Sequence, residues 1–217
     1  MNTKVIKDSG DRTDFGTGAV RDARTGKGRM DLVPLQVIQK LLSKQYEHKT
    51  NMLYKDVFNT ESNELKSIHL FMFTGEVEFL FDAILDIVSH NKEYFNEYSN
   101  LAKELDCPVD YDKVTFLQVL SASTIALSKH FEQGAQKYGE RNWEKGIPLH
   151  FYIDSALRHY MKIKSGFEDE NHHLACLWNL VCAIWVVELG EDKLFDLPYS
   201  QPSMKPVCSK VKEGING

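Results

Sequence analysis

Histidines, carboxylates and basic side chains are concentrated in one window of the sequence, between His130 and His173. Five of the eight histidines of the chain lie there. The window also holds the charged residues Glu132, Lys137, Arg141, Asp154, Arg158, Lys162, Asp169 and Glu170. A solvated helix surface, with ion pairs four residues apart, explains any single one of them. The whole set together favours a polar site.

Four carboxylates in this window lie on successive predicted elements. Glu132 lies on one predicted helix, Asp154 on the next, and Asp169 and Glu170 at the start of a third. They can therefore converge at one end of a helical bundle. Hard divalent cations prefer oxygen ligands of this kind, so we predict that these four residues bind Mg²⁺ or Mn²⁺. The neighbouring basic residues suit a polyphosphate held by that metal, which indicates phosphoryl chemistry.

Three further polar or aromatic residues each have two interpretations. Asn179 lies inside an otherwise apolar predicted helix, where an unpaired amide costs about 1–3 kcal/mol and so needs a partner. It shares a helical strip with His172 and three small residues, which suits either a close helix contact or a ligand. Tyr138 and Trp143 are candidates for stacking on a base, or for core aromatics beside a turn.

The N-terminal segment GTGAVRDARTGKGRMDL (16–32) interleaves glycines with basic residues. Glycine lets the backbone approach an anion closely, so Lys27, Arg29 and Arg21 are candidate phosphate contacts. The segment is not a P-loop, because Lys27 is followed by Gly28 and no strand is predicted before it. A basic arm without a ligand is the alternative interpretation.

The apolar residues of most of the chain recur at intervals of three and four, which is typical of helices. The last predicted helix is apolar nearly all round, so we expect it at the centre of an all-α helical bundle. The expected helices span 35–48, one or two helices within 61–91, then 92–105, 113–138 with Asp110 or Asp112 as its cap and Gly139 at its end, a helix ending at Gly166, and 172–189.

The composition excludes several classes of protein. The chain has 217 residues and a net charge of −5, so a duplex nucleic acid partner is not expected. The four cysteines form no C-x-x-C pair, which argues against a zinc knuckle. No apolar run approaches 18 residues and the N-terminus has no apolar core. We therefore expect no membrane partner and a cytoplasmic location with reduced thiols.

Four blocks in this order resemble one known family. They are DSGDRTDFGTGAVRDARTGKGRMDLVP (8–34), HFEQGAQKYGERNWEKGIPL (130–149), DSALRH (154–159) and HLACLWN (173–179). Together they resemble the phage dATP/dGTP diphosphohydrolases, which are similar to the MazG-like all-α nucleoside triphosphate pyrophosphohydrolases. The resemblance implies metal-dependent cleavage of dATP or dGTP between the α and β phosphates, giving the monophosphate and pyrophosphate. For a phage protein the location would be the host cytoplasm.

The resemblance also implies roles for particular residues. Glu132, Asp154 and His173 fall on acidic or histidine positions of the blocks, and we predict that they are catalytic. A carboxylate or His173 would orient the attacking water, and basic residues would neutralise the departing pyrophosphate. The predicted nucleotide-binding residues are Lys27, Arg29, Arg21, Lys137, Tyr138, Arg141, Asn142, Trp143, Arg158, His159 and Asn179.

The chain departs from the family pattern in an apparent helical insertion at 43–124, which would form a dimer surface or a pocket wall. We expect one all-α domain over 1–217, with a glycine- and arginine-rich segment at 1–32, the core motif helices at 125–190 and a tail at 198–217. The run LFMFTGEVEFLFDAILDIV (70–88) has too many large apolar residues for one buried face. A homo-oligomer, a dimer or tetramer, is therefore expected.

The second departure concerns the E-x-x-E…E-x-x-D signature of the MazG-like enzymes, which is not intact around Glu132. A near match formed by Glu61, Glu64, Glu78 and Asp82 is a rival metal site. Loss of the intact signature leaves a non-catalytic nucleotide-binding or sequestering protein as the alternative function. The chain contains no His-Asp dipeptide, which argues against an HD-type phosphohydrolase.

Overall fold

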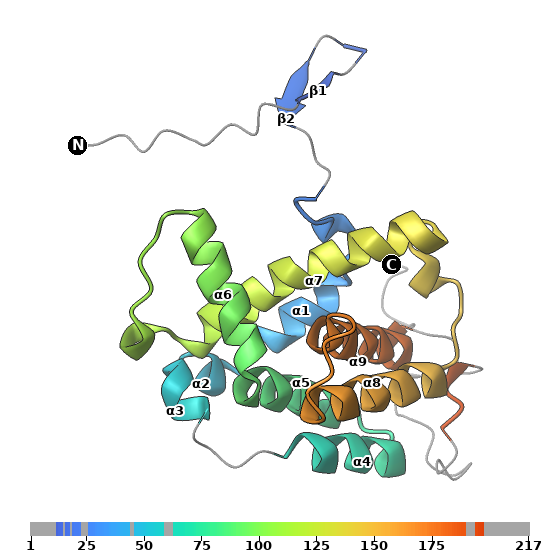
Figure 1. Ribbon diagram of the computed structural model, residues 1–217. Helices are drawn as coiled ribbons and strands as arrows, with labels where there is room; N and C mark the ends of the chain where they lie inside the picture. The colour runs from blue at the N-terminus through green and yellow to red at the C-terminus, as the bar shows by residue number, and fades with distance from the viewer. Residues whose placement is uncertain are drawn as a thin grey trace, which may run out of the picture.

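The computed structural model describes residues 12–14, 16–17, 19–22, 26–43, 46–58, 63–189 and 194–197. Over these residues the chain forms a bundle of nine α-helices, so the predicted all-α class is confirmed (Figure 1). The helices are α1 Leu35–Leu41, α2 Glu47–Thr50, α3 Tyr54–Phe58, α4 Glu64–Thr74, α5 Glu78–His90, α6 Lys92–Glu104, α7 Phe116–Tyr138, α8 Leu149–Lys164 and α9 His172–Leu189. Three short 3-10 helices are η1 Met30–Leu32, η2 Tyr111–Lys113 and η3 Asn142–Glu144.

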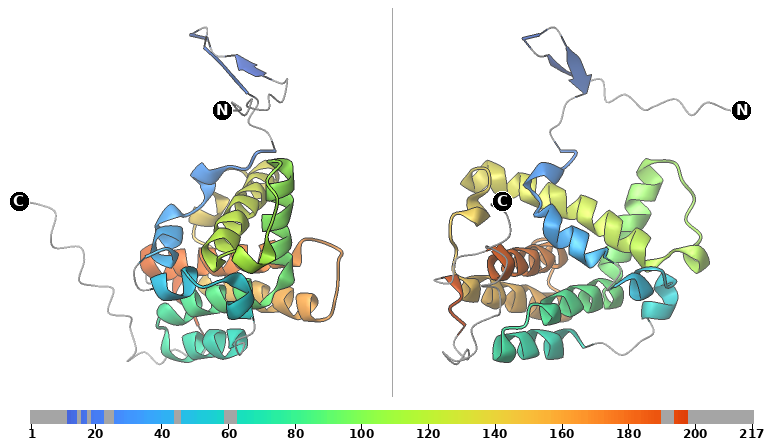
Figure 2. Two further views of the ribbon diagram at one scale, coloured as in Figure 1. Left: turned by 90° about the vertical axis from the view of Figure 1, so that its left-hand side faces the viewer. Right: turned by 180° about the vertical axis from the view of Figure 1, so that it is seen from behind.

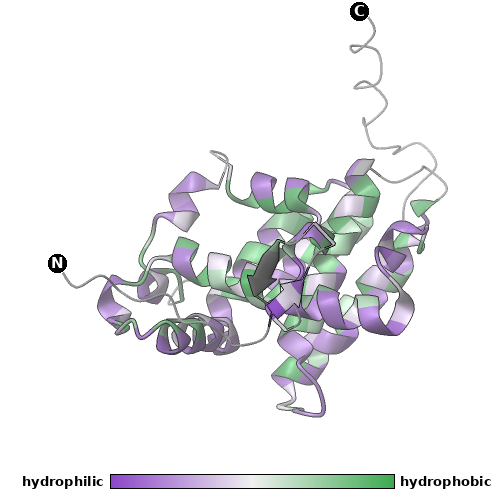
Figure 3. Cartoon of the chain, turned by 90° about the horizontal axis from the view of Figure 1, so that it is seen from above, coloured by the Kyte–Doolittle hydropathy of each residue, from purple (hydrophilic) through white to green (hydrophobic). Residues whose placement is uncertain are grey.

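Helix α9 occupies the centre of the bundle, as its apolar sequence predicts. It contacts α8 most extensively and also packs on α7, α5 and α1. Leu180, Val181 and Ile184 have no exposed surface. The other helices carry both polar and apolar residues, seen as purple and green stretches in Figure 3, and bury the apolar ones.

Helix α7 begins at Phe116, three residues later than predicted, and neither Asp110 nor Asp112 caps it. Asp110 caps η2 instead, through Oδ1 and the backbone N–H of Asp112 at 3.2 Å. Thr115 caps α7 with a capping box: its Oγ1 accepts from the N–H of Gln118 at 3.3 Å, and Gln118 Oε1 accepts from the N–H of Thr115 at 2.8 Å. Gly139 ends the helix as predicted.

The first predicted helix, 35–48, is wrong in its second half. Helix α1 ends at Leu41, and a separate short helix α2 follows at Glu47–Thr50. The chain then runs beside the segment that precedes α7, with Leu53 bridged to Thr115. Just after α1 the backbone forms local turns instead, in which the N–H of Ser43 donates to the carbonyl of Lys40 and that of Tyr46 to the carbonyl of Ser43, both at 3.0 Å.

Most of the large apolar side chains in the run 70–88 are buried within this chain. Leu80, Phe81, Ile84 and Leu85 of α5 are buried against neighbouring helices. Phe73 of α4 is the exception, with 59% of its surface exposed. The feature that suggested self-association is therefore largely explained by intramolecular packing, and the homo-oligomer stays a prediction.

A short β-hairpin lies before the helices, although no strand was predicted there. Strands β1 Arg12–Asp14 and β2 Val20–Asp22 pair antiparallel, with Thr13 opposite Arg21. Both views of Figure 2 show this hairpin apart from the helical body. Strands of three residues are too short to show an alternating pattern, which is why the sequence did not predict them. Among the helices described, none combines the length and hydropathy needed to span a bilayer.

The capping box of α7 provides a test of the fold. Replacing Thr115 by alanine removes the cap, and we expect the free energy of unfolding to fall by about 1 kcal/mol. Urea denaturation followed by circular dichroism measures the change. Thr115→Ser keeps the hydroxyl and should lose much less. Equal stability of the alanine variant and the unmodified chain would show that the cap is dispensable.

Candidate functional site

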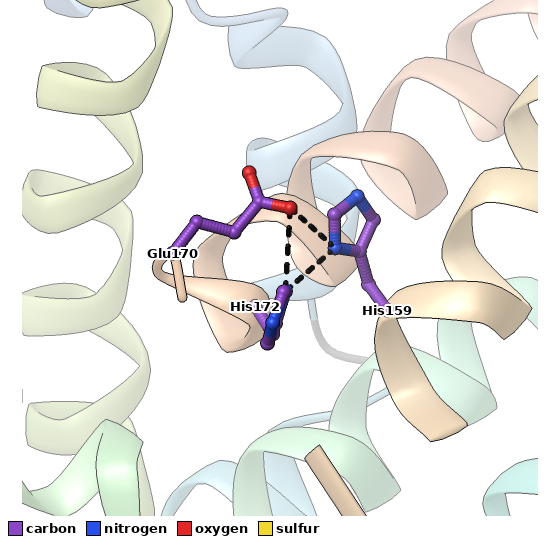
Figure 4. A group of neighbouring side chains, drawn as sticks. All are labelled: His159, Glu170 and His172. Atoms are coloured by element: carbon purple, nitrogen blue, oxygen red, sulfur yellow. Dashed lines mark hydrogen bonds and ion pairs between the residues drawn. The ribbon is translucent and has the colours of Figure 1, made fainter. Parts of the chain in front are cut away.

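Two histidines and a glutamate converge where α8 meets the start of α9. His159 comes from α8, His172 is the first residue of α9, and Glu170 lies in the connecting loop. Their side chains point toward one another in Figure 4. The two Nδ1 atoms are 3.1 Å apart, and Glu170 Oε1 lies 3.4 Å from Nδ1 of His172 and 3.7 Å from Nδ1 of His159. We call these residues the His-His-Glu triad.

Asp169 fixes the orientation of one triad member. Its Oδ1 lies 2.8 Å from Nε2 of His172, and Lys162 Nζ lies 3.0 Å from its Oδ2. The hydrogen bond with His172, followed by that with Lys162, lowers the pKa of Asp169 to about 2. An ionised Asp169 holds the proton of a neutral His172 on Nε2, which leaves the lone pair on Nδ1, inside the triad.

The donor atoms of the triad fit a single divalent ion. Bonds from imidazole nitrogen or carboxylate oxygen to such ions are about 2.0–2.2 Å long. Ligand atoms around one ion at these bond lengths lie roughly 3.0–3.5 Å apart, close to the separations in the triad. Among the described residues, this is the group in which three metal-type ligand atoms come together. The buried His172 is oriented from outside by Asp169, the arrangement usual for a metal-binding histidine.

One face of α7 looks toward the triad. His130 and Lys137 are seven residues apart, so they lie on the same side of the helix. Burial lowers the pKa of His130, whereas the charge of Glu170 opposes this effect. Glu170 also adds to the raised pKa of Lys137, which arises first from its contact with Tyr138. The charge of Glu170 therefore reaches both His130 and Lys137, although for neither is it the main cause of the pKa shift.

Glu132 lies on the opposite side of α7, because a helix turns by about 200° over two residues from His130. There it is buried, with 9% of its surface exposed. Its Oε1 accepts from the N–H of Gly26 and its Oε2 from the N–H of Gly28, both at 3.0 Å. The glycine segment therefore does approach an anion closely, but that anion is the carboxylate of Glu132.

The glycine segment is held on α7 by further contacts. The Arg29 guanidinium binds Asp31 in a two-pronged pair, and its Nη1 lies 2.7 Å from Oε1 of Glu140. These hydrogen bonds raise the pKa of Arg29, so its charge is already balanced by two carboxylates. Arg141 Nη2 donates to the carbonyl of Asp31 at 3.0 Å and ties the segment to the turn after α7. Lys27 is exposed, and the side chain of Arg21 lies outside the described residues.

An aromatic cavity of about 370 Å³ lies between α7, the turn after it and α9. Its lining residues are Leu32, His130, Phe131, Gly134, Ala135, Tyr138, Gly139, Arg141, Asn142, Trp143, Ile147 and Trp178. Four predicted nucleotide-binding residues, from Tyr138 to Trp143, are thus brought to one cavity. His130 lines this cavity, and its pKa is also affected by the charge of Glu170 in the triad.

Trp143 has an unusual environment in this cavity wall. Only 5% of its surface is exposed, and its Nε1 has no hydrogen-bond acceptor among the described residues. An unpaired buried donor costs about 1–3 kcal/mol. Nearby, Arg141 has a φ of 52°, a left-handed conformation that is strained for a residue with a side chain. Both features are common at ligand sites.

The remaining predicted residues lie apart from the triad or are bound to other groups. Asp154 and Arg158 form an exposed ion pair on α8, with Nη1 and Oδ2 2.6 Å apart. His173 Nε2 lies 3.2 Å from Oε1 of Glu97, on α6, and this bond is the main cause of the lowered pKa of Glu97. Asn179 donates to the carbonyl of Ala175 in its own helix at 2.8 Å. The four predicted metal-binding carboxylates therefore do not meet at one point.

The rival acidic set is also dispersed. Glu64 is buried, and Lys164 Nζ lies 3.5 Å from its Oε1. Asp82 lies on α5, where burial raises its pKa and Lys49 opposes the effect. Glu61 lies outside the described residues. Of this set, the described members form no cluster of metal-type ligands.

His172 and His130 were not among the site residues predicted from the sequence. His172 was considered only as a neighbour of Asn179. The spacing Asp169-x-x-His172 was the available signal, since residues three apart across a helix start can form a hydrogen bond. For His130, the signal was its position four residues before Gly134 and seven before Lys137.

Glycines 26 and 28 allow a matched test of the segment held by Glu132. Both have a positive φ, +78° and +87°, which costs an alanine about 1–2 kcal/mol. A Cβ on Gly26 meets nothing within 4 Å, but a Cβ on Gly28 would lie 2.1 Å from Ser128 Oγ. That hydroxyl is held by the carbonyl of Ile125 at 2.7 Å. Gly28→Ala should therefore release the segment much more than Gly26→Ala.

Limited trypsin cleavage after Lys27 and Arg29 measures this release. We expect at least about a tenfold faster cleavage in Gly28→Ala than in Gly26→Ala, corresponding to about 1.4 kcal/mol of additional local opening. The same rate in both variants would mean that the close approach to Ser128 does not hold the segment.

Comparison with known proteins relates this site to one family. Residues 108–195 match the family model described as dATP/dGTP diphosphohydrolase, N-terminal. No curated protein and no solved structure matches the chain significantly. The match covers α7, α8, α9 and the whole triad, and it begins inside the segment 43–124 that was interpreted as an insertion. Residues 108–195, about two fifths of the chain, are therefore similar to the dATP/dGTP diphosphohydrolase N-terminal family.

Proposed function

We propose that the protein hydrolyses purine deoxynucleoside triphosphates to the monophosphate and pyrophosphate, using a divalent ion bound by the His-His-Glu triad. The observation that carries this proposal is the convergence of three metal-type ligand atoms within the segment that matches the diphosphohydrolase family. The family description supports action on dATP and dGTP. A cytoplasmic location, where these nucleotides are found, is part of the proposal.

The donor set of the triad favours Mn²⁺ over Mg²⁺. Magnesium prefers oxygen ligands and retains several waters, whereas imidazole nitrogens suit the transition metals. With two imidazoles and one carboxylate, the triad is less suited to Mg²⁺ than the four carboxylates expected from the sequence. When bound, the ion would supply positive charge to the phosphates and lower the pKa of a water molecule.

Basic side chains near the triad would bind the phosphates. Lys162 Nζ lies 3.0 Å from Asp169 and 3.9 Å from Glu170, and Lys137 on α7 experiences the charge of Glu170. These two cations flank the triad from two helices, α8 and α7. They would stabilise the charge that develops on the departing pyrophosphate.

The proton of the attacking water requires an acceptor. His173 adjoins the triad in sequence, and its bond to Glu97 holds the ring in place. The aromatic ring of Tyr94 also packs edge-on against it, with ring centroids 5.2 Å apart. We therefore assign the acceptor role to His173, with Glu97 orienting its imidazole.

The alternative function is nucleotide sequestration without turnover. Both functions require the same phosphate-binding cations, so the reaction products distinguish them. Incubation with each dNTP and Mn²⁺ should give the monophosphate and pyrophosphate in equal amounts, measured by anion-exchange chromatography. Release of inorganic phosphate alone would indicate a different bond cleavage, and tight binding of an intact dNTP would favour sequestration.

Single substitutions distinguish the triad from the predicted carboxylate set. We expect Glu170→Gln to lower turnover at least about a hundredfold and to abolish Mn²⁺ binding measured by isothermal titration calorimetry, because a charged ligand is lost without a change in volume. His172→Asn should behave alike. Glu168→Gln, on the same exposed loop but outside the triad, is the matched control and should resemble the unmodified protein.

The substitution Asp154→Asn distinguishes the His-His-Glu triad from the predicted set of four carboxylates as the metal site. The triad requires Mn²⁺ affinity to survive this change, whereas the carboxylate set requires its loss. Glu132→Gln should retain Mn²⁺ binding for the same reason, because both oxygens of Glu132 serve the glycine segment. Loss of the metal in these two variants, with Glu170→Gln unaffected, would reject the triad.

A further inference from the structure

The aromatic cavity has the chemistry of a site for a planar heteroaromatic ring. The Phe131 ring centroid lies 5.8 Å from that of Trp143 and 5.8 Å from that of Trp178, so three aromatic side chains share one wall. Nucleic-acid bases stack on such side chains. The volume of about 370 Å³ lies within the range of small-molecule sites.

Gly134 keeps this cavity open on the side of α7. Glycine is unfavourable in the middle of a helix, so its presence needs a reason. A Cβ built on Gly134 meets nothing within 4 Å, which shows that packing does not require glycine here. A side chain at this position would project into free space that belongs to the cavity.

Trp143 lines the cavity and carries a buried polar group. Its Nε1–H is buried without an acceptor, while its backbone is held by the Tyr152 hydroxyl, which donates to the Trp143 carbonyl at 3.1 Å. The edge-on packing of its ring with Trp185, with centroids 4.9 Å apart, further restrains it. A ligand that brings an acceptor to this nitrogen would satisfy a donor that has no partner among the residues that the structure describes.

The cavity and the triad adjoin the same face of α7. His130, Gly134 and Tyr138 are spaced by four residues and line the cavity together. Lys137, one residue from Tyr138, and His130 both experience the charge of Glu170 in the triad. A nucleotide with its base in the cavity would thus direct its phosphates toward Lys137 and the triad.

We propose that the aromatic cavity is the base subsite of the nucleotide site, and that Trp143 Nε1–H donates to a ring nitrogen or carbonyl oxygen of the base. The identity of the ligand as a nucleotide rests on the proposed function. The placement of its base rests on the cavity, Gly134 and the unpaired indole.

Indole signals in the ¹⁵N–¹H spectrum of the full chain test the contact directly. The chain has three tryptophans, so their three indole N–H signals can be assigned by replacing each with phenylalanine. Addition of dGMP or dAMP without metal should shift the Trp143 signal more than that of Trp185. The base-free probe 2-deoxyribose 5-phosphate should leave the Trp143 signal in place. The proposal is overturned if neither nucleotide shifts the Trp143 signal, or if the base-free probe shifts it as much as the nucleotides do.

Filling the cavity gives the second test. Gly134→Leu should weaken dGMP binding at least tenfold in isothermal titration calorimetry. Gln136→Leu adds the same side chain to an exposed position of α7 and should bind dGMP as the unmodified protein does. Gly134→Ala should raise the thermal unfolding midpoint, because it removes a helix-interior glycine without a clash.

The outcomes separate this proposal from the proposed function. Unchanged dGMP binding by a folded Gly134→Leu variant overturns the base subsite, whether or not dNTPs are hydrolysed. Nucleotide binding that depends on Gly134 and shifts Trp143, without any dNTP hydrolysis, rejects the proposed function and leaves the base subsite standing. If Gly134→Leu does not fold, the indole measurement on the unmodified protein decides.

Discussion

The close contact between α8 and α9 determines where the rest of the site can lie. Cys176 Sγ approaches the Ala156 carbonyl to 3.4 Å, and neither residue has exposed surface. Small side chains on both helices permit this approach. His159 follows Ala156 by three residues and His172 precedes Cys176 by four, so both imidazoles lie on the contact faces. The helix contact thereby brings two distant histidines together and leaves the loop between them to supply Glu170.

Carboxylates that look alike in the sequence have different partners in the structure. Asp169 receives an imidazole and an ammonium group, Glu170 faces two imidazoles, and Glu132 receives two backbone N–H groups. Asp154 has a guanidinium partner on an exposed surface. The N–H groups of Gly26 and Gly28 satisfy the buried carboxylate of Glu132, which is how a carboxylate anchors a chain segment. Local partners, more than residue type, therefore separate the structural carboxylates from the candidate metal ligands.

Much of the helical framework could be predicted from the sequence because its signals are local. The periodicity and end residues of α6, α8 and α9 specify helices whose bounds agree closely with the expected ranges. The break after α1 was missed because residues 42–46 include no glycine or proline that would mark it in the sequence. Tyr138 and Trp143 were predicted as stacking aromatics, and Arg141 and Asn142 as nucleotide-binding residues that the family resemblance implies; all four line the cavity.

Which side chains meet at the site could not be predicted in the same way, because this depends on how each helix is rotated about its axis. Asp154 and His159 are five residues apart on α8, so they point about 140° away from each other. His130 and Glu132 are almost opposite on α7. Sequence spacing gives these relative angles but does not say which residue faces the neighbouring helix. Packing against α9 determines that the face of α8 with His159 and the face of α7 with His130 turn toward the site.

The close contact between α8 and α9 also makes the core chemically inert at its centre. Burial raises the pKa of Cys176 to about 12 and also raises that of Cys182, so both sulfurs remain protonated thiols at neutral pH. A thiol attacks alkylating reagents only as the thiolate, and neither sulfur is accessible in the folded bundle. Modification of Cys176 thus requires α8 and α9 to separate, the same motion that would pull His159 away from His172. The rate at which Cys176 is alkylated therefore measures how often His159 and His172 separate.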